Sequence, residues 1–335
     1  MNPGTGRNSF DWIHIAKGIG IILVVIGHCH LKPSPTYWAE IRTIIYFFHM
    51  PLFFILSGYL YSHGKYSYSS LMKNKVKRLI YPFISIAGSF FLIKYVAGQF
   101  ITLWNPINIE SIYALLIDPM HSFMPLLWFL HALFLIFAIY PLARLFLSNL
   151  SIMFLLLAIN FFLGNDYLVF GRALSFMPFF VFGAILRESG KLSKLAIGAD
   201  WRYVLAPVMM FFLAYMLRSS VRIIYDYGYP VKTFLGISGS LFVINASHAI
   251  AALLDKRTKS MLLQIGYYSM TIYLLHSLFE SAVRIGFSHV FKNIQAPFEL
   301  IAFISITCGI VFPLVIEKNV LRKFSITKKF VLGLD

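Results

Sequence analysis

A lysine and a histidine stand eleven residues apart on the first apolar stretch of the chain, KGIGIILVVIGHCHLKP. Lys17 opens this stretch and His28 lies near its end. Ionisable groups are costly in lipid and usually face a cavity or a pathway, so both are candidate functional residues. An imidazole can remove a proton from a hydroxyl group near neutral pH. The alternative for Lys17 is a side chain that only reaches the inner membrane interface.

Three more histidines, His49, His131 and His276, lie on separate apolar stretches, and Trp128 stands beside His131. The topology derived below places these residues, like His28, toward the outer side of a membrane. We expect a layer of imidazoles there that handles substrate. For His131, the alternative is an interfacial residue next to a belt of aromatic side chains.

The stretch IGYYSMTIYLLHSLF carries Ser269 and Tyr273, four residues apart, and His276 three residues later. This spacing places the three side chains on one face of a helix. They are candidate donors to an oxygen atom that gains negative charge during a reaction. Hydrogen bonding between helices is the alternative.

A second layer of ionisable residues lies on the opposite side. It contains Asp11 and Lys17 at the start of the first stretch, with Lys75 and Arg78 in KNKVKRLIYPF. A basic entrance of this kind attracts phosphate groups. The alternative is that Lys75 and Arg78 only fix the orientation of the chain in the membrane.

The composition defines the elements that must position these residues. Of 335 residues, 59% are hydrophobic and 13% are charged, far from the values of soluble domains. A membrane span needs about 20 apolar residues, and about ten such stretches occur. We expect an all-α polytopic membrane protein with these helices in one bundle and with residues 1–335 in one domain. The stretches are centred near Ile22, Phe53, Phe90, Leu135, Leu156, Phe179, Met210, Leu241, Tyr273 and Ile306.

The net charge of +16 reflects membrane topology better than nucleic-acid binding. No Lys or Arg occurs between Lys94 and Arg144, whereas clusters follow the second, sixth and eighth stretches and end the chain. The positive-inside rule therefore predicts that both termini are cytoplasmic. The clusters are Lys65, Lys73, Lys75, Lys77 and Arg78; Arg187, Lys191, Lys194 and Arg202; Lys256, Arg257 and Lys259; and Lys318, Arg322, Lys323, Lys328 and Lys329.

The two cysteines, Cys29 and Cys308, lie in the first and last stretches and are expected to be small buried residues rather than a disulfide framework. Lys17 interrupts the first apolar run, and no small-residue cleavage site follows it. We expect an uncleaved first span.

Several blocks of the sequence resemble, in order, the bacterial membrane acyltransferase-3 family. They are FDWIHIAKGIGIILVVIGHC, FFHMPLFFILSGYLY, VKRLIYPF, LLWFLHALFLIF, PFFVFGAIL and IGYYSMTIYLLHSLF. Members carry a basic residue and a histidine separated by ten residues on the first span, which correspond to Lys17 and His28. Many members have arginine at the first position, so a bidentate contact there becomes a point-charge contact.

This resemblance implies an enzyme of the inner membrane that moves an acetyl group from cytoplasmic acetyl-CoA to a hydroxyl of a surface polysaccharide or lipid-linked sugar. Lys17 and the lack of a fused outer domain look most like the fucose 4-O-acetylase-like subgroup. The resemblance implies acetyl-CoA as a substrate, with no tightly bound cofactor and no metal. His28 is the expected general base, and transient acetylation of His28 is the open alternative.

The expected layers match the shape of acetyl-CoA. Lys17, Lys75 and Arg78 would bind the phosphates, and the pantetheine arm would carry the thioester toward His28. Eleven residues of helix span roughly 16 Å, which is comparable to the reach of that arm. Catalytic roles are thus predicted for His28, Lys17, Asp11 and His276, with His49, Trp128, His131, Ser269 and Tyr273 near the substrates.

Two other classes of protein remain open from the residues alone. A secondary transporter also places ionisable residues inside a bundle, but it predicts an inverted repeat that the sequence does not display convincingly. A flippase or a structural partner of a glycan assembly complex is the other alternative.

Overall fold

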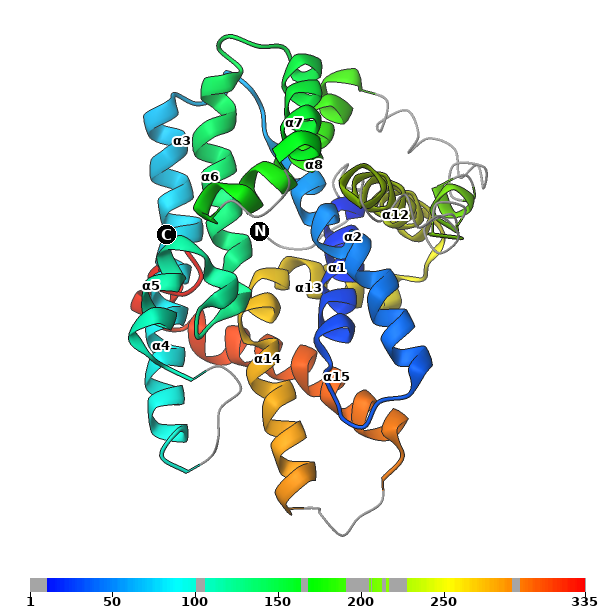
Figure 1. Cartoon of the computed structure of the whole chain (residues 1–335). Coiled ribbons are helices and arrows are strands. Elements are labelled where there is room, and N and C mark those ends of the chain that lie inside the picture. Colours follow the sequence, from blue (N-terminus) through cyan, green and yellow to red (C-terminus); the bar gives the residue numbers. More distant parts are fainter. Residues whose placement is uncertain are drawn as a thin grey trace. The chain divides into compact units, whose positions relative to one another are not determined.

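The protein is all-helical in a computed structural model, which describes residues 11–100, 106–163, 168–190, 205, 207–212, 215–216, 228–290 and 296–334. No β-strand occurs within these ranges. Figure 1 shows the helices along the chain. Two compact units form, and each combines two segments of the sequence: residues 1–56 with 186–315, and residues 57–185 with 316–335. We call them unit 1 and unit 2 and describe each by itself.

Seven described helical runs are long and apolar enough to cross a membrane, and they coincide with seven of the ten predicted stretches. The stretch around Leu156 is a shorter apolar helix, and that around Tyr273 is a helix of 17 residues. The stretch around Met210 lies largely outside the described residues, as do Lys191, Lys194 and Arg202. The number of ten spans, the cytoplasmic termini and the single domain stay predictions.

Unit 1 contains α1 (Asp11–His28), most of α2 (Thr36–Leu60), α12 (Gly228–Leu253), α13 (Lys256–Tyr267), α14 (Ser269–Ile285) and most of α15 (Phe298–Ile316). Helix α1 packs against α12, α13 and α14. Its side chains are buried on several faces, including Ile13, Ile15, Ile21 and Val24. A helix that is apolar all round belongs in the interior of its unit, so α1 carries its ionisable residues into the core.

A glycine permits the close approach of α13 to α1. A Cβ atom built on Gly266 would collide with the backbone oxygen of His14, and one on Gly18 would lie 2.6 Å from the Leu262 oxygen. Small residues let membrane helices approach at backbone distance. This crossing fixes α1 at the level of Lys17, one residue before Gly18.

Unit 2 contains α3 (Tyr68–Lys75), which continues through the π-helical Val76–Ile80 into α4 (Tyr81–Ala97), and α5 (Ile109–Ile117). It also contains α6 (Trp128–Ala143), α7 (Asn149–Leu163), most of α8 (Leu168–Ser189) and α16 (Ser325–Phe330). Its core includes an aromatic cluster in which the Phe180 ring lies 5.0 Å from Tyr140 and 5.1 Å from Phe137 between centroids. The buried Tyr140 hydroxyl donates to Asn149 Oδ1 at 2.6 Å.

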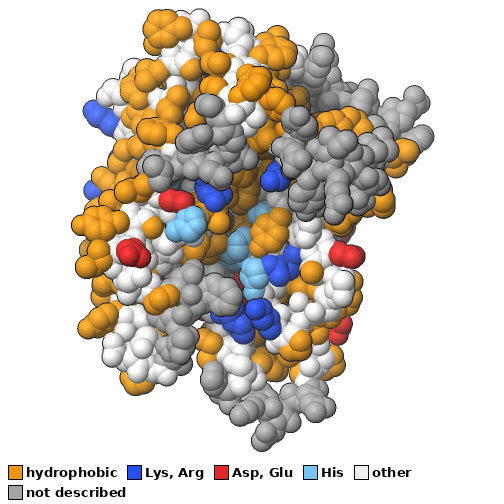
Figure 2. Space-filling view, viewed as in Figure 1, with side chains coloured by type: hydrophobic (Ala, Val, Ile, Leu, Met, Phe, Trp, Pro, Cys, Tyr) orange, Lys and Arg blue, Asp and Glu red, His pale blue; other side chains and the backbone are white. Residues whose placement is uncertain are grey.

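Much of the surface is apolar. Hydrophobic side chains cover large parts of the face drawn in Figure 2, and Phe146 and Phe162 are 85% and 80% exposed. Exposed apolar area on this scale is unfavourable in water and favourable in lipid. The chain is therefore a multi-pass membrane protein.

Candidate functional site

Three histidines from three helices meet in unit 1. The His28 ring on α1 lies 5.3 Å from the His276 ring on α14 and 6.2 Å from the His49 ring on α2, measured between centroids. His49 and His276 are buried, whereas His28 is only partly buried. We call these residues the histidine cluster. The structure thus brings together three of the four histidines of the predicted layer.

Each imidazole of the histidine cluster uses one ring nitrogen in the same way. Nδ1 lies 2.9 Å from the Val24 oxygen in His28, 2.8 Å from the Ile45 oxygen in His49 and 3.0 Å from the Ile272 oxygen in His276. A carbonyl oxygen can only accept, so each Nδ1 carries the proton and donates it to the preceding turn. In each neutral ring, Nε2 is therefore the acceptor that remains for chemistry.

An arginine and a tyrosine that sequence reasoning did not select join this cluster. Arg42 Nε donates to the Gly27 oxygen at 2.9 Å, and the Tyr46 hydroxyl donates to the same oxygen at 2.8 Å. The Tyr46 ring lies 5.8 Å from His28 and 5.1 Å from His49. Arg42, Tyr46 and His49 follow the i, i+4, i+7 spacing of one helix face, which is the signal that could have found them.

The charge of Arg42 also acts on the residues just after α1. Arg42 donates to His30 Nδ1 at 2.7 Å, and partial burial followed by the charge of Arg42 lowers the pKa of His30 to about 4. Burial, followed by the carboxylate of Glu280, raises the pKa of the Cys29 thiol to about 11. Cys29 is fully buried against Leu31 and Ala302, so it is the small buried residue that we expected.

The other end of α1 holds Asp11 and Lys17. Asp11 forms an ion pair with Lys259 of α13 at 2.9 Å, and the Trp12 ring stacks on His248 at 4.4 Å. Lys17 is partly buried one helical turn beyond His14 and acts on that imidazole electrostatically. The Asp11 contact fastens the start of α1 to α13, a role that does not require substrate.

Helix α14 carries the remaining unit 1 candidates. Ser269 is its first residue, and Tyr273 is buried with its ring 6.3 Å from that of His276. The backbone oxygen of Tyr273 accepts a second bond from His276 Nδ1 at 2.8 Å. In its neutral form His276 thus offers an acceptor, and donating to an oxyanion would require its protonated form.

Lys75, Arg78, Trp128 and His131 belong to unit 2. The Lys75 ammonium lies 3.4 Å from the centroid of the Phe137 ring, and Arg78 is exposed beside the Gly333 backbone. Arg172 lies over the Trp128 ring at 5.7 Å, while the His131 ring lies 6.4 Å from that of Phe83. The shared donor entrance of Lys17, Lys75 and Arg78 spans both units and stays a prediction, as does the place of His131 in the layer.

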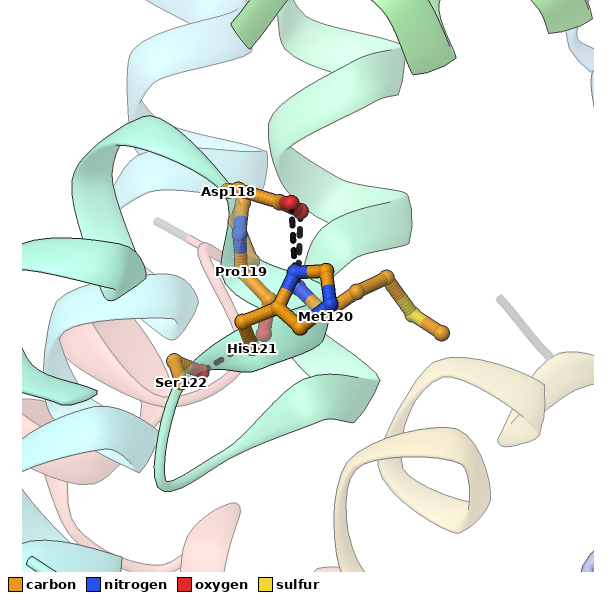
Figure 3. A network of polar contacts seen from close by, with 5 residues as sticks. All are labelled: Asp118, Pro119, Met120, His121 and Ser122. Carbon is orange, nitrogen blue, oxygen red and sulfur yellow. Dashed lines mark hydrogen bonds and ion pairs between the residues drawn. The ribbon is translucent and has the colours of Figure 1, made fainter. Parts of the chain in front are cut away.

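Another histidine, in the turn before α6, forms a local contact. His121 Nδ1 lies 2.6 Å from Asp118 Oδ2, and Asp118 Oδ1 accepts from the Met120 backbone at 3.3 Å (Figure 3). Ser122 Oγ donates to the Pro119 oxygen at 2.6 Å. We call this segment the Asp118 turn. The His121 side chain is 78% exposed.

Across the described ranges, no group of three or more His, Cys, Asp or Glu side chains is arranged to hold a metal ion.

Comparison with protein families decides the class of this chain. A family model described as an acyltransferase domain matches residues 10–316. The chain belongs to the acyltransferase-3 family. It is therefore a membrane acyltransferase, and the matched range includes the histidine cluster, Lys17 and every other predicted site residue. No curated protein and no solved structure matches this acyltransferase.

Proposed function

We propose that this acyltransferase moves an acetyl group from cytoplasmic acetyl-CoA to a sugar hydroxyl of a surface polysaccharide or lipid-linked sugar, with His28 Nε2 as the general base. The observation that carries this proposal is the fixed orientation of the His28 ring. Its Nδ1 is held by the Val24 oxygen at 2.9 Å, so the basic Nε2 atom is directed by the helix itself. His28 is also the partly exposed member of the histidine cluster, whose other two members are buried.

The acetyl group can pass to the sugar directly or through an acetylated histidine. The sugar oxygen attacks the thioester carbonyl carbon while its proton passes to His28 Nε2. The carbon–sulfur bond breaks, and the departing CoA thiolate receives a proton. In the covalent alternative, Nε2 attacks the carbonyl carbon first and the carbon–sulfur bond breaks. The sugar oxygen then attacks the acetyl-imidazole, Nε2 leaves, and the hydroxyl proton passes to the CoA thiolate. Both routes need the same unprotonated Nε2.

Lys17 is the proposed contact for phosphate groups of the donor on unit 1, and Lys75 and Arg78 are the proposed contacts on unit 2. Lys17 lies about three helical turns from His28, roughly 16 Å along α1. The resemblance to fucose 4-O-acetylase-like enzymes and a bacterial inner membrane location belong to the same proposal. His49, His131, Trp128, Ser269 and Tyr273 are proposed to line the path of the substrates.

The face of transfer follows from the proposed topology. His28 ends the proposed outward-running span α1, and the His49 ring on the inward-running α2 lies 6.2 Å from the His28 ring, so we place both in the outer half of the bilayer. The acceptor would enter from outside while CoA leaves into the cytoplasm. In sealed proteoliposomes, an impermeant glycan should be acetylated only on the face opposite acetyl-CoA. Equal transfer with both substrates on the cytoplasmic face would overturn this sidedness and leave the acyltransferase class untouched.

The function itself is tested with the purified full-length protein in detergent. We expect CoA release that depends on a glycan acceptor, together with an acetylated glycan detected by mass spectrometry. Comparison of surface glycans from cells with and without the protein identifies the natural acceptor. Turnover with another acyl-CoA and none with acetyl-CoA would replace the proposed donor.

A further inference from the structure

Helix α14 holds a buried carboxyl group that the proposed reaction does not use. Glu280 lies one turn beyond His276 on the same helix face, and it is 6% exposed whereas His276 is 0% exposed. Acidic side chains are almost never buried to this degree unless they are paired. Yet Glu280 Oε1 is buried without a hydrogen-bond partner among the described residues, and so is His276 Nε2.

The two unpartnered atoms are both acceptors. His276 Nδ1 already donates to the Ile272 and Tyr273 oxygens, so its Nε2 carries a lone pair. Oε1 of the Glu280 carboxyl group likewise carries lone pairs and can accept. Buried polar groups without partners are costly, and such a pair is explained when a ligand supplies the missing donors.

The unpartnered pair of His276 and Glu280 lies next to His28, the proposed base. The His276 ring lies 5.3 Å from that of His28. On the side of α15, a Cβ atom built on Gly309 would lie 3.2 Å from Glu280 Cγ and 3.6 Å from His276 Cβ. Glycine at position 309 therefore lets α15 pass close by without a side chain between the two residues.

The charged groups near Glu280 limit which kind of ligand can donate a hydrogen bond to it. Arg284 and Arg42 both act electrostatically on Glu280, but their hydrogen bonds go to Ser281, Gly27 and His30. Two guanidinium groups disfavour an ammonium ligand at this place, and an anion without a proton has nothing to donate to the two unpartnered acceptor atoms. A neutral ligand rich in hydroxyl groups satisfies both conditions.

We propose that Glu280 Oε1 and His276 Nε2 form a binding subsite for the hydroxyl groups of the acceptor sugar, adjacent to the hydroxyl that His28 deprotonates. Glu280 then determines specificity, because an acceptor without the neighbouring hydroxyl leaves the carboxylate unpaired. This subsite deepens the proposed function and rests on it for the identity of the acceptor as a sugar.

The test uses methyl glycosides of common hexopyranoses and their monodeoxy derivatives as probes, with full-length protein in detergent and without acetyl-CoA. Binding is measured by the increase in thermal unfolding temperature across a concentration series. We expect at least one glycoside to stabilise the wild type, and one of its deoxy derivatives to bind about tenfold more weakly or worse. This measurement needs no variant, so it does not depend on the folding of one.

The variant Glu280→Leu removes the acceptor and keeps a buried side chain of similar size. We expect it to unfold at an equal or higher temperature than wild type without ligand, and to bind the glycoside and its deoxy derivative equally weakly. Glu280→Gln retains an acceptor oxygen and should keep part of the discrimination. The matched control is Glu299→Leu in the same unit, because Glu299 accepts from the exposed Tyr37 hydroxyl and lies outside the subsite.

Two results would overturn the subsite: no glycoside stabilises the wild type, or Glu280→Leu discriminates as well as wild type does. The proposed function is assayed separately, by acetyl transfer to the same glycosides. Binding that depends on Glu280 without any acetyl transfer keeps the subsite and rejects the reaction. Transfer with specificity unchanged in Glu280→Leu keeps the reaction and rejects the subsite.

Discussion

The histidine cluster of unit 1 and the Asp118 turn of unit 2 use imidazole in opposite ways. In the cluster, Nδ1 of each ring is bound by a backbone oxygen of its own helix. In the Asp118 turn, Nδ1 of His121 is bound by a carboxylate three residues away, and the side chain is otherwise exposed. The first arrangement orients three acceptors inside a unit, whereas the second stabilises a local turn.

Orientation of one ring nitrogen by its own helix, rather than the presence of a carboxylate partner, marks the candidate reaction site in this chain. An exposed ion pair contributes little free energy because water competes for both groups. A buried imidazole with one nitrogen fixed can act on substrate without competing water. The predictions below alter one region at a time.

The largest expected effect comes from the helix crossing that supports the histidine cluster. Gly266→Leu places a side chain where the His14 backbone oxygen lies, and overpacking of this kind costs about 1–3 kcal/mol or more. We expect a lower unfolding temperature and lower activity, measured by thermal unfolding in detergent and by CoA release. Gly286→Ala in the same unit is the control, since its added Cβ meets nothing within 4 Å. Equal behaviour of the two variants would contradict the assigned crossing.

A smaller effect is expected at the proposed donor contacts. Lys17→Gln and Arg78→Gln each remove one charge that would bind phosphate, and hydrogen bonds to charged groups contribute about 1.5–3 kcal/mol. We therefore expect the KM for acetyl-CoA to rise about 10- to 100-fold with a smaller change in kcat. Lys73→Gln, an exposed neighbour on α3, should leave KM unchanged. An unchanged KM in both test variants would assign these cations to membrane orientation alone.

The smallest expected effect is on how the stability of the protein depends on pH. Partial burial and then the charge of Arg42 lower the pKa of His30 from 6.5 to about 4, so the folded protein keeps this imidazole neutral while the unfolded chain protonates it. The associated stability is complete above pH 6.5 and is lost as the pH falls toward 4. His30→Gln, which can still accept from Arg42, should reduce the fall in unfolding temperature between pH 7 and pH 4.5. An identical fall in both proteins would contradict the neutral state of folded His30.

Much of the fold can be predicted from the length of the apolar stretches in the sequence. Seven stretches form helical runs of sufficient length to span a membrane, because a bilayer leaves the backbone few alternatives to a helix. The division into two units, each built from separate segments, has no such local signal, since it depends on side-chain packing between distant helices. The glycines at the α1–α13 crossing, for example, acquire meaning only when their partners are known.

The candidate site was partly predictable for the same reason. His28, His49 and His276 were selected because ionisable residues are rare and costly in lipid. Arg42 and Glu280 are ionisable as well, but most of the basic candidates were taken from the charge clusters on the opposite side of the membrane, which is predicted to be cytoplasmic. Their helical spacings, seven residues before His49 and four after His276, place them on the same faces as those histidines. Which nitrogen of each ring is free cannot be deduced without the helix geometry.

Parallel substitution of His28 and His121 tests whether His28 Nε2 removes the proton of the acceptor. Purified His28→Asn, His121→Asn and wild-type protein are compared for acetyl transfer from acetyl-CoA, with equal unfolding temperatures as the criterion of intact folding. We expect His28→Asn to lose about 10²–10⁴-fold in rate and His121→Asn to retain wild-type turnover. Wild-type turnover in folded His28→Asn would contradict this role of His28.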